Sequence, residues 1–315
     1  MTELRTRWLS DDVGVVDLNF QGYPALIATY VMKTSAGVAL IETGPGSTLP
    51  ALKNGLATLE IELNDIQHIL LTHIHLDHAG AAGSLLAELP AAKLYVHERG
   101  VRHMLNPERL VSSARQIYGA LMDPLWGDFL PAPEERTFAI TDGDKIQVGA
   151  TTLDVHYTPG HAAHHVAFHE PERNIIFAGD VAGVRVPPSP LIWPPTPPPD
   201  IDVEAWQAST QRLRALDPEK IMITHFDEYA DVGRHLDELD ARLAQWVDWV
   251  AAWRAQALTR AQMIAELEQA VLDEIASEPD STSTVYATKY VTPFYMSVDG
   301  LMRYIDKRES YAVSE

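Results

Sequence analysis

The hydrophobic positions along the chain follow two different periods. Up to about residue 229, short apolar runs of strand length alternate with turn signals and with segments of helix-forming composition. The runs predict strands at 25–32, 37–41, 66–72, 93–97, 137–140, 145–148, 152–157, 165–169, 174–178 and 220–224. Two predicted helices, at 49–59 and 79–89, lie between the early strands. This order of strands and helices indicates an α/β fold.

From about residue 230 the apolar positions take on the spacing of helices. A seam with alternating steps of four and three residues runs through Leu239, Leu243, Trp246, Val250 and Trp253. A second helix is predicted from a capping box of Thr259 and Gln262 to about residue 275, followed by a polar loop at 277–284 and a final helix at 294–305. We therefore expect a first domain at 1–229 and a C-terminal helical subdomain at 230–315. Because the seam must be buried somewhere, it also predicts a homodimer.

Two segments of the first domain depart from the strand pattern. Residues 98–136 contain short helix-like stretches at 101–105 and 110–121, which indicates a helical insertion of the kind that often overhangs a site. Residues 187–199 contain eight prolines in thirteen positions, so this segment is predicted to be a stiff loop rather than a helix or a central strand. Substrate contacts are expected from these two segments.

Charge and composition exclude several classes of protein. The chain has 315 residues and a formal net charge of −20, which argues against nucleic acid and against anionic membranes as partners. No apolar run approaches the ~18 to 20 residues that a membrane span needs. The first residues lack the basic and apolar regions of a signal peptide. We therefore expect a cytoplasmic protein with a small-molecule substrate.

The residue types that remain point to a metal site built from nitrogen and oxygen. The chain has no cysteine, so thiolate-bound zinc and iron–sulfur clusters are excluded. The segment His73-Ile74-His75-Leu76-Asp77-His78 follows a buried strand and places three imidazoles and one carboxylate in six positions. In a tight turn, His73 and His75 can face one metal ion while Asp77 and His78 face a second.

Three more candidate ligands follow other predicted strands. His161 stands in a Pro-Gly-His turn, Asp180 in a Gly-Asp pair, and His225 directly after the strand at 220–224. The carboxyl ends of strands are where loops gather into functional sites in sheet proteins. The sequence therefore offers seven candidate ligands that could converge on one centre.

The motif His-x-His-x-Asp-His, the Pro-Gly-His turn, the Gly-Asp pair and the late histidine together resemble the metallo-β-lactamase superfamily over about residues 10–229. This resemblance implies a four-layer αββα sandwich with a dinuclear metal site between its sheets. It implies a first metal held by His73, His75 and His161, a second held by Asp77, His78 and His225, and Asp180 as the bridge. The family's early Asp-Thr-Gly turn is also present, with Glu42 in place of the aspartate before Thr43-Gly44.

Imidazole and carboxylate ligands suit two divalent ions, Zn²⁺ above all, with Fe or Mn as alternatives. The leading hypothesis is a hydrolase whose metal-bridging hydroxide attacks an ester, thioester or lactone carbonyl of a small molecule. Asp77 would orient the hydroxide or carry its proton, and the helical extension is similar to that of glyoxalase II. The expected substrate contacts are His165, Tyr118, Arg185 and Trp193. His164 is expected to face solvent, and His235 to lie on a helix surface.

Two other classes of function stay open. Persulfide dioxygenases resemble this fold and bind a single iron through the His-x-His pair and the later aspartate, so a mononuclear iron dioxygenase acting on persulfides is the main alternative. A binding or regulatory protein with a retained metal site is the third. Nucleases of the same superfamily are disfavoured by the net charge of −20.

Overall fold

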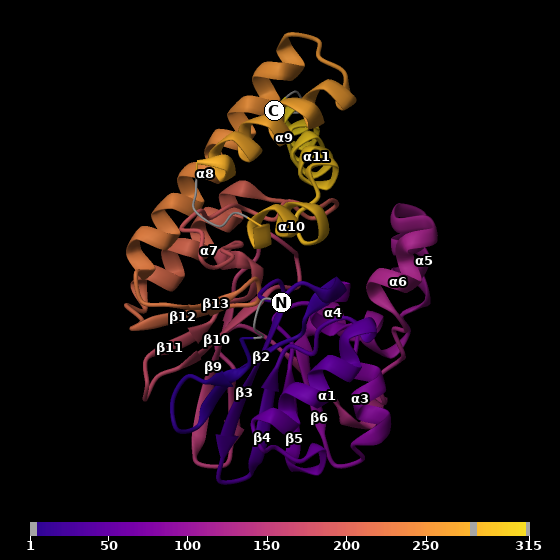
Figure 1. The fold of residues 1–315 in the computed structure, drawn as a ribbon, viewed down its shortest axis with the longest axis vertical. Helices are drawn as coiled ribbons and strands as arrows, with labels where there is room; N and C mark the ends of the chain where they lie inside the picture. The colour runs from indigo at the N-terminus through magenta and orange to yellow at the C-terminus, as the bar shows by residue number, and fades with distance from the viewer. Residues whose placement is uncertain (1–4, 278–281, 313–315) are drawn as a thin grey trace.

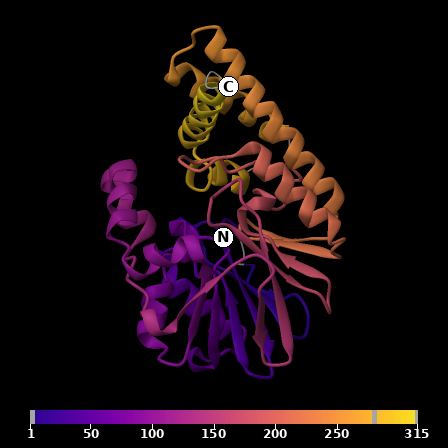
Figure 2. The ribbon, with the colours of Figure 1, turned by 180° about the vertical axis from the view of Figure 1, so that it is seen from behind.

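The structure is a computed structural model that describes residues 5–277 and 282–312. Two β-sheets lie face to face in the first part of the chain, and a group of long helices stands at one end of them (Figure 1). Seen from behind, the same layers keep the early helices on one outer side and the later helices on the other (Figure 2). This arrangement confirms the predicted α/β sandwich with a C-terminal helical region.

The first sheet contains seven strands within the described residues, in the order β1-β2-β3-β4-β5-β6-β7. Their bounds are β1 Arg7–Trp8, β2 Val13–Asp17, β3 Ala28–Thr34, β4 Gly37–Ile41, β5 Ile66–Leu70, β6 Lys93–His97 and β7 Thr137–Ile140. β1 to β4 pair antiparallel, whereas β4 to β7 run parallel. The parallel part needs crossover helices, which are α1 Leu49–Thr58, α2 Leu76–Ala79 and α3 Ala82–Glu88.

The second sheet has the order β13-β12-β11-β10-β9-β8. Its strands are β8 Lys145–Val148, β9 Thr151–Tyr157, β10 Val166–Glu170, β11 Ile175–Phe177, β12 Lys220–Ile223 and β13 Asp227–Tyr229. Only β11 and β12 are parallel, and helix α7 (Val203–Ala215) connects them. The predicted strands of both sheets are confirmed, whereas β1, β2 and β13 were not predicted from the sequence.

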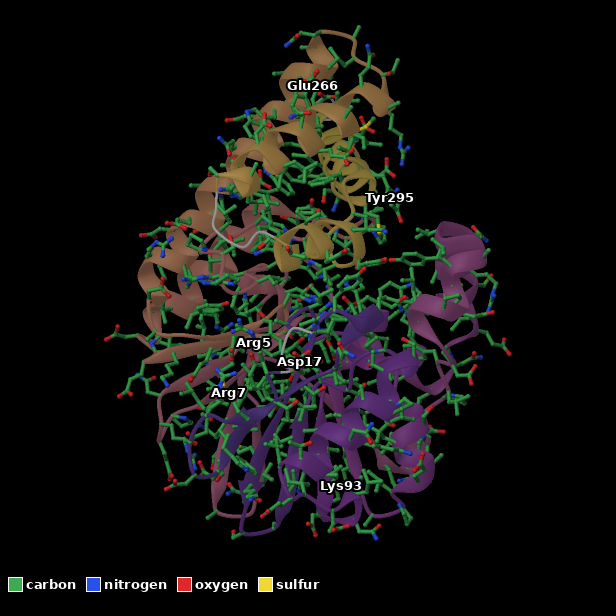
Figure 3. All side chains as sticks on the ribbon, viewed as in Figure 1. Arg5, Arg7, Asp17, Lys93, Glu266 and Tyr295 are labelled. Carbon is green, nitrogen blue, oxygen red and sulfur yellow. The ribbon has the colours of Figure 1, made fainter. Side chains whose placement is uncertain are left out.

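The two sheets share one apolar core. All five residues of β2 and of β10 are buried, which is typical of strands covered on both faces. Side chains fill the space between the layers (Figure 3). Buried polar contacts also join the sheets: the Tyr30 hydroxyl donates to the carbonyl of Ile223 at 2.7 Å, and the Ala28 amide donates to the carbonyl of Thr224 at 2.8 Å. The strand ends that carry the candidate ligands are therefore held at fixed positions.

The helical insertion predicted at 98–136 lies between β6 and β7. It contains α4 Glu98–Leu105, α5 Glu108–Tyr118 and α6 Met122–Trp126. Helix α5 stands at the outer side of the sandwich (Figure 1), and α6 packs against the turn Gly46–Thr48 that follows β4. The proline-rich segment predicted as a loop carries no helix or named strand and is tied down by a single β-bridge between Val184 and Trp193.

The C-terminal helices bury the predicted seam within the same chain. They are α8 Val232–Ala255, α9 Arg260–Ala276, α10 Thr282–Tyr290 and α11 Phe294–Ala312. Leu239, Leu243, Trp246 and Val250 are buried, and α8 packs against α7 and α11. Trp253 is half-buried and stacks on Trp249. Because these contacts already cover the seam, it does not require a second copy, and the homodimer stays a prediction.

Two sequence predictions for the C-terminal region can be compared with the structure. The capping box at Thr259 is confirmed, since its side chain accepts from the Gln262 amide while the Gln262 side chain accepts from the Thr259 amide. The loop predicted at 277–284 lies partly outside the described residues, and helix α10 already begins at Thr282. In the part of the chain that the structure describes, none of the helices combines the length and apolar character of a membrane span.

Candidate metal centre

Four chain segments bring the seven candidate ligands to one edge of the sandwich. His73 and His75 follow β5, and Asp77 and His78 lie on the single turn of α2. His161 follows β9 after Gly160, whose φ of +136° and close approach to the Trp206 backbone leave no room for a side chain. Asp180 follows β11, and His225 follows β12. The resulting cluster lies between the two sheets.

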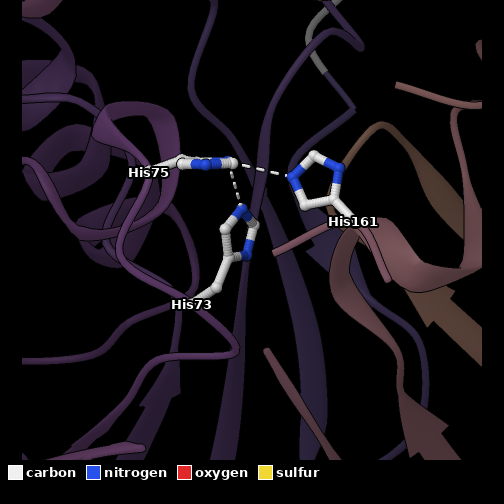
Figure 4. Close-up of side chains that lie close together, drawn as sticks. All are labelled: His73, His75 and His161. Atoms are coloured by element: carbon white, nitrogen blue, oxygen red, sulfur yellow. Dashed lines mark hydrogen bonds between the residues drawn. The ribbon is translucent and has the colours of Figure 1, made fainter. Parts of the chain in front are cut away.

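His73, His75 and His161 form a first group of converging imidazoles (Figure 4). The Nδ1 atom of His75 lies 2.9 Å from Nε2 of His73 and 2.9 Å from Nε2 of His161. Each neutral imidazole has one lone-pair nitrogen, so three ring nitrogens at this spacing cannot all be satisfied by hydrogen bonds to one another. A cation between them would use all three lone pairs.

Asp77, His78 and His225 form a second group. The Oδ2 atom of Asp77 lies 3.4 Å from Nε2 of His225 and 3.8 Å from Nε2 of His78. Both histidines are buried, whereas the Asp77 side chain keeps 16% of its surface exposed. This carboxylate is therefore the member of the second group that solvent can reach.

Asp180 lies between the two groups and faces both. Its Oδ2 atom is 3.5 Å from Nε2 of His161, in the first group. Its Oδ1 atom is 3.3 Å from Nε2 of His78 and 3.4 Å from Nε2 of His225, in the second. A carboxylate with one oxygen toward each of two ligand groups has the geometry of a bridge between two ions.

The donor atoms fit divalent metal ions. Three buried atoms, Nε2 of His78, Nε2 of His225 and Oδ1 of Asp180, have no hydrogen-bond partner among the described residues. Unpaired polar atoms of this kind are costly in a protein interior unless something binds them. In addition, the opposite nitrogen of two histidines is occupied, because Nδ1–H of His161 donates to Pro195 and Nδ1–H of His225 donates to Leu26, each at 2.8 Å. These bonds direct the Nε2 lone pairs into the centre, as metal-binding histidines require.

The protonation of the protein without metal follows from the same contacts. Burial lowers the pKa of His161 to about 3, so its imidazole stays neutral. Burial also acts to lower the pKa of His225, but the Asp180 and Asp77 carboxylates outweigh it and raise this pKa to about 9. They raise the pKa of His78 as well. In the absence of metal, protons on these two histidines balance the carboxylates, and bound cations would replace those protons.

Glu42 is a functional candidate to which the sequence analysis gave no role. It is buried, adopts a left-handed backbone conformation with φ of +67°, and places Oε1 3.2 Å from Nδ1 of His78. The Thr72 hydroxyl donates to the same carboxylate and lies 3.0 Å from Nδ1 of His73. Glu42 therefore lies behind a histidine of each group, in direct approach to His78 and through the Thr72 hydroxyl to His73. Its place in the Glu-Thr-Gly turn was the signal that the sequence offered.

A cavity of about 820 Å³ opens onto the centre, a size that suits a small-molecule ligand. His75, Asp77, His161 and Asp180 lie at its base. Its walls come from α4 and α5, from the proline-rich loop, and from the segment that joins α10 to α11. The wall residues used below are Arg99, Arg102, His103, Arg109, Leu110, Ala114, Ile117, Tyr118, Trp126, Asp200 and Met296.

The four predicted substrate contacts are placed differently by the structure. Tyr118 lines the cavity. His165 lies buried behind the first group, where Nδ1 is 2.9 Å from the Thr158 hydroxyl, a position that suits support of the ligands. Arg185 and Trp193 are not among the lining residues: Arg185 pairs with Asp231 at 2.8 Å and Trp193 donates to Thr292 at 2.8 Å.

Two histidines expected at the surface lie elsewhere. His164 lines the cavity, where its Nδ1 accepts a 3.4 Å hydrogen bond from the Ile74 amide. His235 is fully buried, and its Nε2–H donates to the carbonyl of Ala182 at 2.7 Å. The expectation for His235 was wrong because α7 and the turn after β11 cover that face of α8.

Comparison with known proteins agrees with the fold. A family model described as the metallo-beta-lactamase superfamily matches residues 22–225, and the chain belongs to this superfamily. Its relatives include the metallo-beta-lactamase fold-containing protein ST1585 of Sulfurisphaera tokodaii, which is 27% identical over 207 residues, 64% of this chain and 74% of the relative. The hydroxyacylglutathione hydrolase of Aeromonas salmonicida is 30% identical over 157 residues, 50% of this chain and 48% of the relative. The chain thus spans about half the length of that hydrolase.

The C-terminal helices are also found in a related structure. The crystal structure of the metallo-beta-lactamase family protein TTHA1429 from Thermus thermophilus superposes with a TM-score of 0.69 and 22% sequence identity. The superposition covers 96% of this chain and 95% of that one. At this identity the likeness concerns the fold, and it extends over both the sandwich and the helices that follow it.

Proposed function

We propose that the protein is a dinuclear metal-dependent hydrolase that cleaves an ester, thioester or lactone of a small molecule. The observation that carries the proposal is Asp180, whose two oxygens face two separate ligand groups at 3.3 to 3.5 Å. Two divalent ions held there would lower the pKa of a bound water and polarise a carbonyl group. Zn²⁺ suits the all-nitrogen-and-oxygen donor set, with Fe or Mn as alternatives.

The residues around the centre support hydrolysis in particular. Net reaction adds water across the bond between the acyl carbon and the oxygen or sulfur of the leaving group, so one proton must move to the leaving group. Asp77 lines the cavity and is placed to orient the water that supplies that proton. Burial would raise its pKa, but His78 and His225 outweigh this and hold the pKa of Asp77 at about 2. Asp77 is therefore a carboxylate at neutral pH and can accept a hydrogen bond from the attacking water.

The similarity to a hydroxyacylglutathione hydrolase supports the same class of reaction. The mononuclear iron dioxygenase remains the competing proposal, since His73, His75 and Asp180 suffice for one ion. The second group speaks for two ions, because Asp77, His78 and His225 would be superfluous in a one-iron centre and two of its buried nitrogens have no hydrogen-bond partner in the described chain.

Metal content and hydrolysis together test the proposal. Protein isolated without added metal is analysed by elemental mass spectrometry and assayed against panels of thioesters, lactones and aryl esters. We expect about two equivalents of a divalent metal per chain and EDTA-sensitive hydrolysis of at least one panel. One equivalent of iron, with oxygen consumption in the presence of a persulfide, would instead establish the dioxygenase. Metal binding without any turnover would favour a regulatory protein.

A further inference from the structure

Three arginines line the cavity above the metal centre, although the protein as a whole is strongly acidic. Arg99 and Arg102 lie on α4, and Arg109 lies on the first turn of α5. Within the described chain, none of the three forms an ion pair with a carboxylate within 4 Å, and Arg109 makes no side-chain hydrogen bond. By contrast Arg115, on the same helix as Arg109, pairs with Asp123 at 2.8 Å.

Arg102 and Arg109 are the two arginines whose guanidinium N–H groups are mostly available to a ligand. Arg99 already donates to the Tyr157 hydroxyl at 3.0 Å, whereas the Arg102 side chain makes one hydrogen bond in the described structure, to His103 at 3.1 Å. Both Arg102 and Arg109 are exposed at the cavity wall. The Nε–H of Arg102 donates to Nε2 of the cavity-lining His103 at 3.1 Å. Burial and then the charges of Arg102 and Arg109 lower the pKa of His103, against a smaller opposite effect of Asp200.

The acidic residues of the cavity do not neutralise these arginines directly. Glu98 and Asp200 also line it, and Asp200 accepts a hydrogen bond from the Ala163 amide at 3.3 Å. Neither carboxylate lies within ion-pair distance of Arg102 or Arg109 in the described residues. A planar guanidinium with unused donors is well suited to bind a carboxylate or phosphate.

One face of α5 presents apolar side chains to the same cavity. Leu110, Ala114, Ile117 and Tyr118 recur at helical spacing along α5, and all four line the cavity. Ile117 keeps 47% of its surface exposed, so it is open to contact with a ligand in the cavity. Met296 of α11 lies across from this face, in contact with Tyr118. Candidate metal ligands, an apolar wall and the two arginines Arg102 and Arg109 therefore line the same cavity.

We propose that the substrate is an amphiphilic acyl compound with an apolar chain and a terminal anionic group, a carboxylate or a phosphate, which Arg102 and Arg109 bind. This inference rests on the proposed hydrolase function, which places the acyl carbon at the metal centre. The apolar chain lies along the face of α5, and the anionic group selects the substrate and sets its direction in the cavity.

Matched thioesters test the proposal in the metal-loaded enzyme. The probes are S-phenyl thioesters of one chain length whose far end is a carboxylate, a phosphonate or a primary amide. We expect the wild type to prefer one of the anionic probes over the amide in kcat/KM. In the double variant R102Q/R109Q, kcat/KM for that probe should fall by about 10-fold to 100-fold, as expected for lost charge-assisted hydrogen bonds, while the amide probe is unaffected. R115Q is the matched control, since it removes the same charge from the same helix outside the cavity.

The results distinguish a failure of the anionic-substrate proposal from a failure of the proposed hydrolase function. Hydrolysis of all three probes with equal kcat/KM, unchanged in R102Q/R109Q, overturns the anionic substrate and leaves the hydrolase in place. If no probe is hydrolysed, binding of octanoate and octanamide is measured by calorimetry in the wild type and in both variants. Octanoate binding that weakens at least about 10-fold in R102Q/R109Q alone supports the anion site without the hydrolase. Equal binding in every variant overturns it.

Discussion

The hydroxyl of Tyr118 donates to the sulfur of Met296 at 3.5 Å, which joins two residues that are 178 positions apart in the chain. Tyr118 ends α5 of the insertion, and Met296 lies in the first turn of α11. Both line the cavity, so its upper wall exists only because the insertion and the C-terminal helices meet there. The C-terminal helices therefore form part of the cavity wall.

This contact predicts that loss of the Tyr118 side chain weakens substrate binding and leaves the chemical step unchanged. Replacement of Tyr118 by alanine should raise KM about 5-fold or more, because a large aromatic contact in the pocket is lost, and should change kcat little. Steady-state kinetics on the best substrate of the hydrolysis panels measures both constants. The Y118F variant keeps the ring and should stay close to the wild type. An equal fall of kcat in both variants would show that the hydroxyl acts in the chemistry instead.

Asp180 provides a prediction about metal content. The D180N variant keeps the size of the side chain but removes the charge that faces both ligand groups, so it should bind about one metal ion per chain or fewer and lose at least about 1,000-fold in kcat. Elemental analysis and kinetics of the same preparation give both numbers. D248N, at an exposed position of α8, is the charge-matched control. Two full equivalents of metal in D180N would contradict the bridging role.

Glu42 is predicted to act through the histidines that it orients. The E42Q variant should weaken metal affinity about 10-fold to 100-fold, the usual effect of losing a carboxylate behind a ligand histidine. Competition with a chromophoric chelator measures this affinity in the absence of any substrate. E60Q removes an exposed carboxylate at a turn and should leave the affinity unchanged. If E42Q binds metal as tightly as E60Q does, Glu42 serves the fold and not the centre.

His235 predicts how stability depends on pH. Burial lowers its pKa to about 4, from about 6.5 in an unfolded chain. The folded state therefore favours the neutral ring. Its contribution to the free energy of unfolding is fully present above pH 6.5 and is lost as the pH falls toward 4, on the order of 3 kcal/mol in total. Urea unfolding of EDTA-treated protein at several pH values measures this free energy. As the pH falls, it should decrease less in H235Q than in the wild type, because glutamine keeps an N–H donor but does not titrate. Parallel curves for the two proteins would refute the assignment.

The seven candidate ligands were predictable because each belongs to a short motif at the end of an apolar strand. The spacing of His73, His75, Asp77 and His78 already implies convergence, since one tight turn holds all four. His161, Asp180 and His225 share the same place at the end of a strand. The predicted seam of α8 was also visible, because its steps of four and three residues depend only on helix geometry.

The walls of the cavity could not be predicted in the same way. Arg102 and Met296 are far apart in sequence, and only the tertiary fold brings α4 and the start of α11 to one space. Arg185 and Trp193 follow Asp180 closely, yet their side chains turn toward Asp231 and Thr292. Proximity in sequence to a ligand fixes the backbone but not the direction of a side chain, which depends on long-range partners.

The base and the walls of the cavity are encoded by separate stretches of the chain. Its base comes from strand ends of the sandwich, whereas its upper walls come from an insertion after β6 and from helices after β13. The two meet at the proline-rich loop, where Gly300 of α11 packs closely on Thr196 and the neighbouring Pro195 carbonyl accepts from Nδ1–H of His161 at 2.8 Å. Variation in the peripheral helices would therefore reshape the cavity, while the candidate ligands stay on the sandwich.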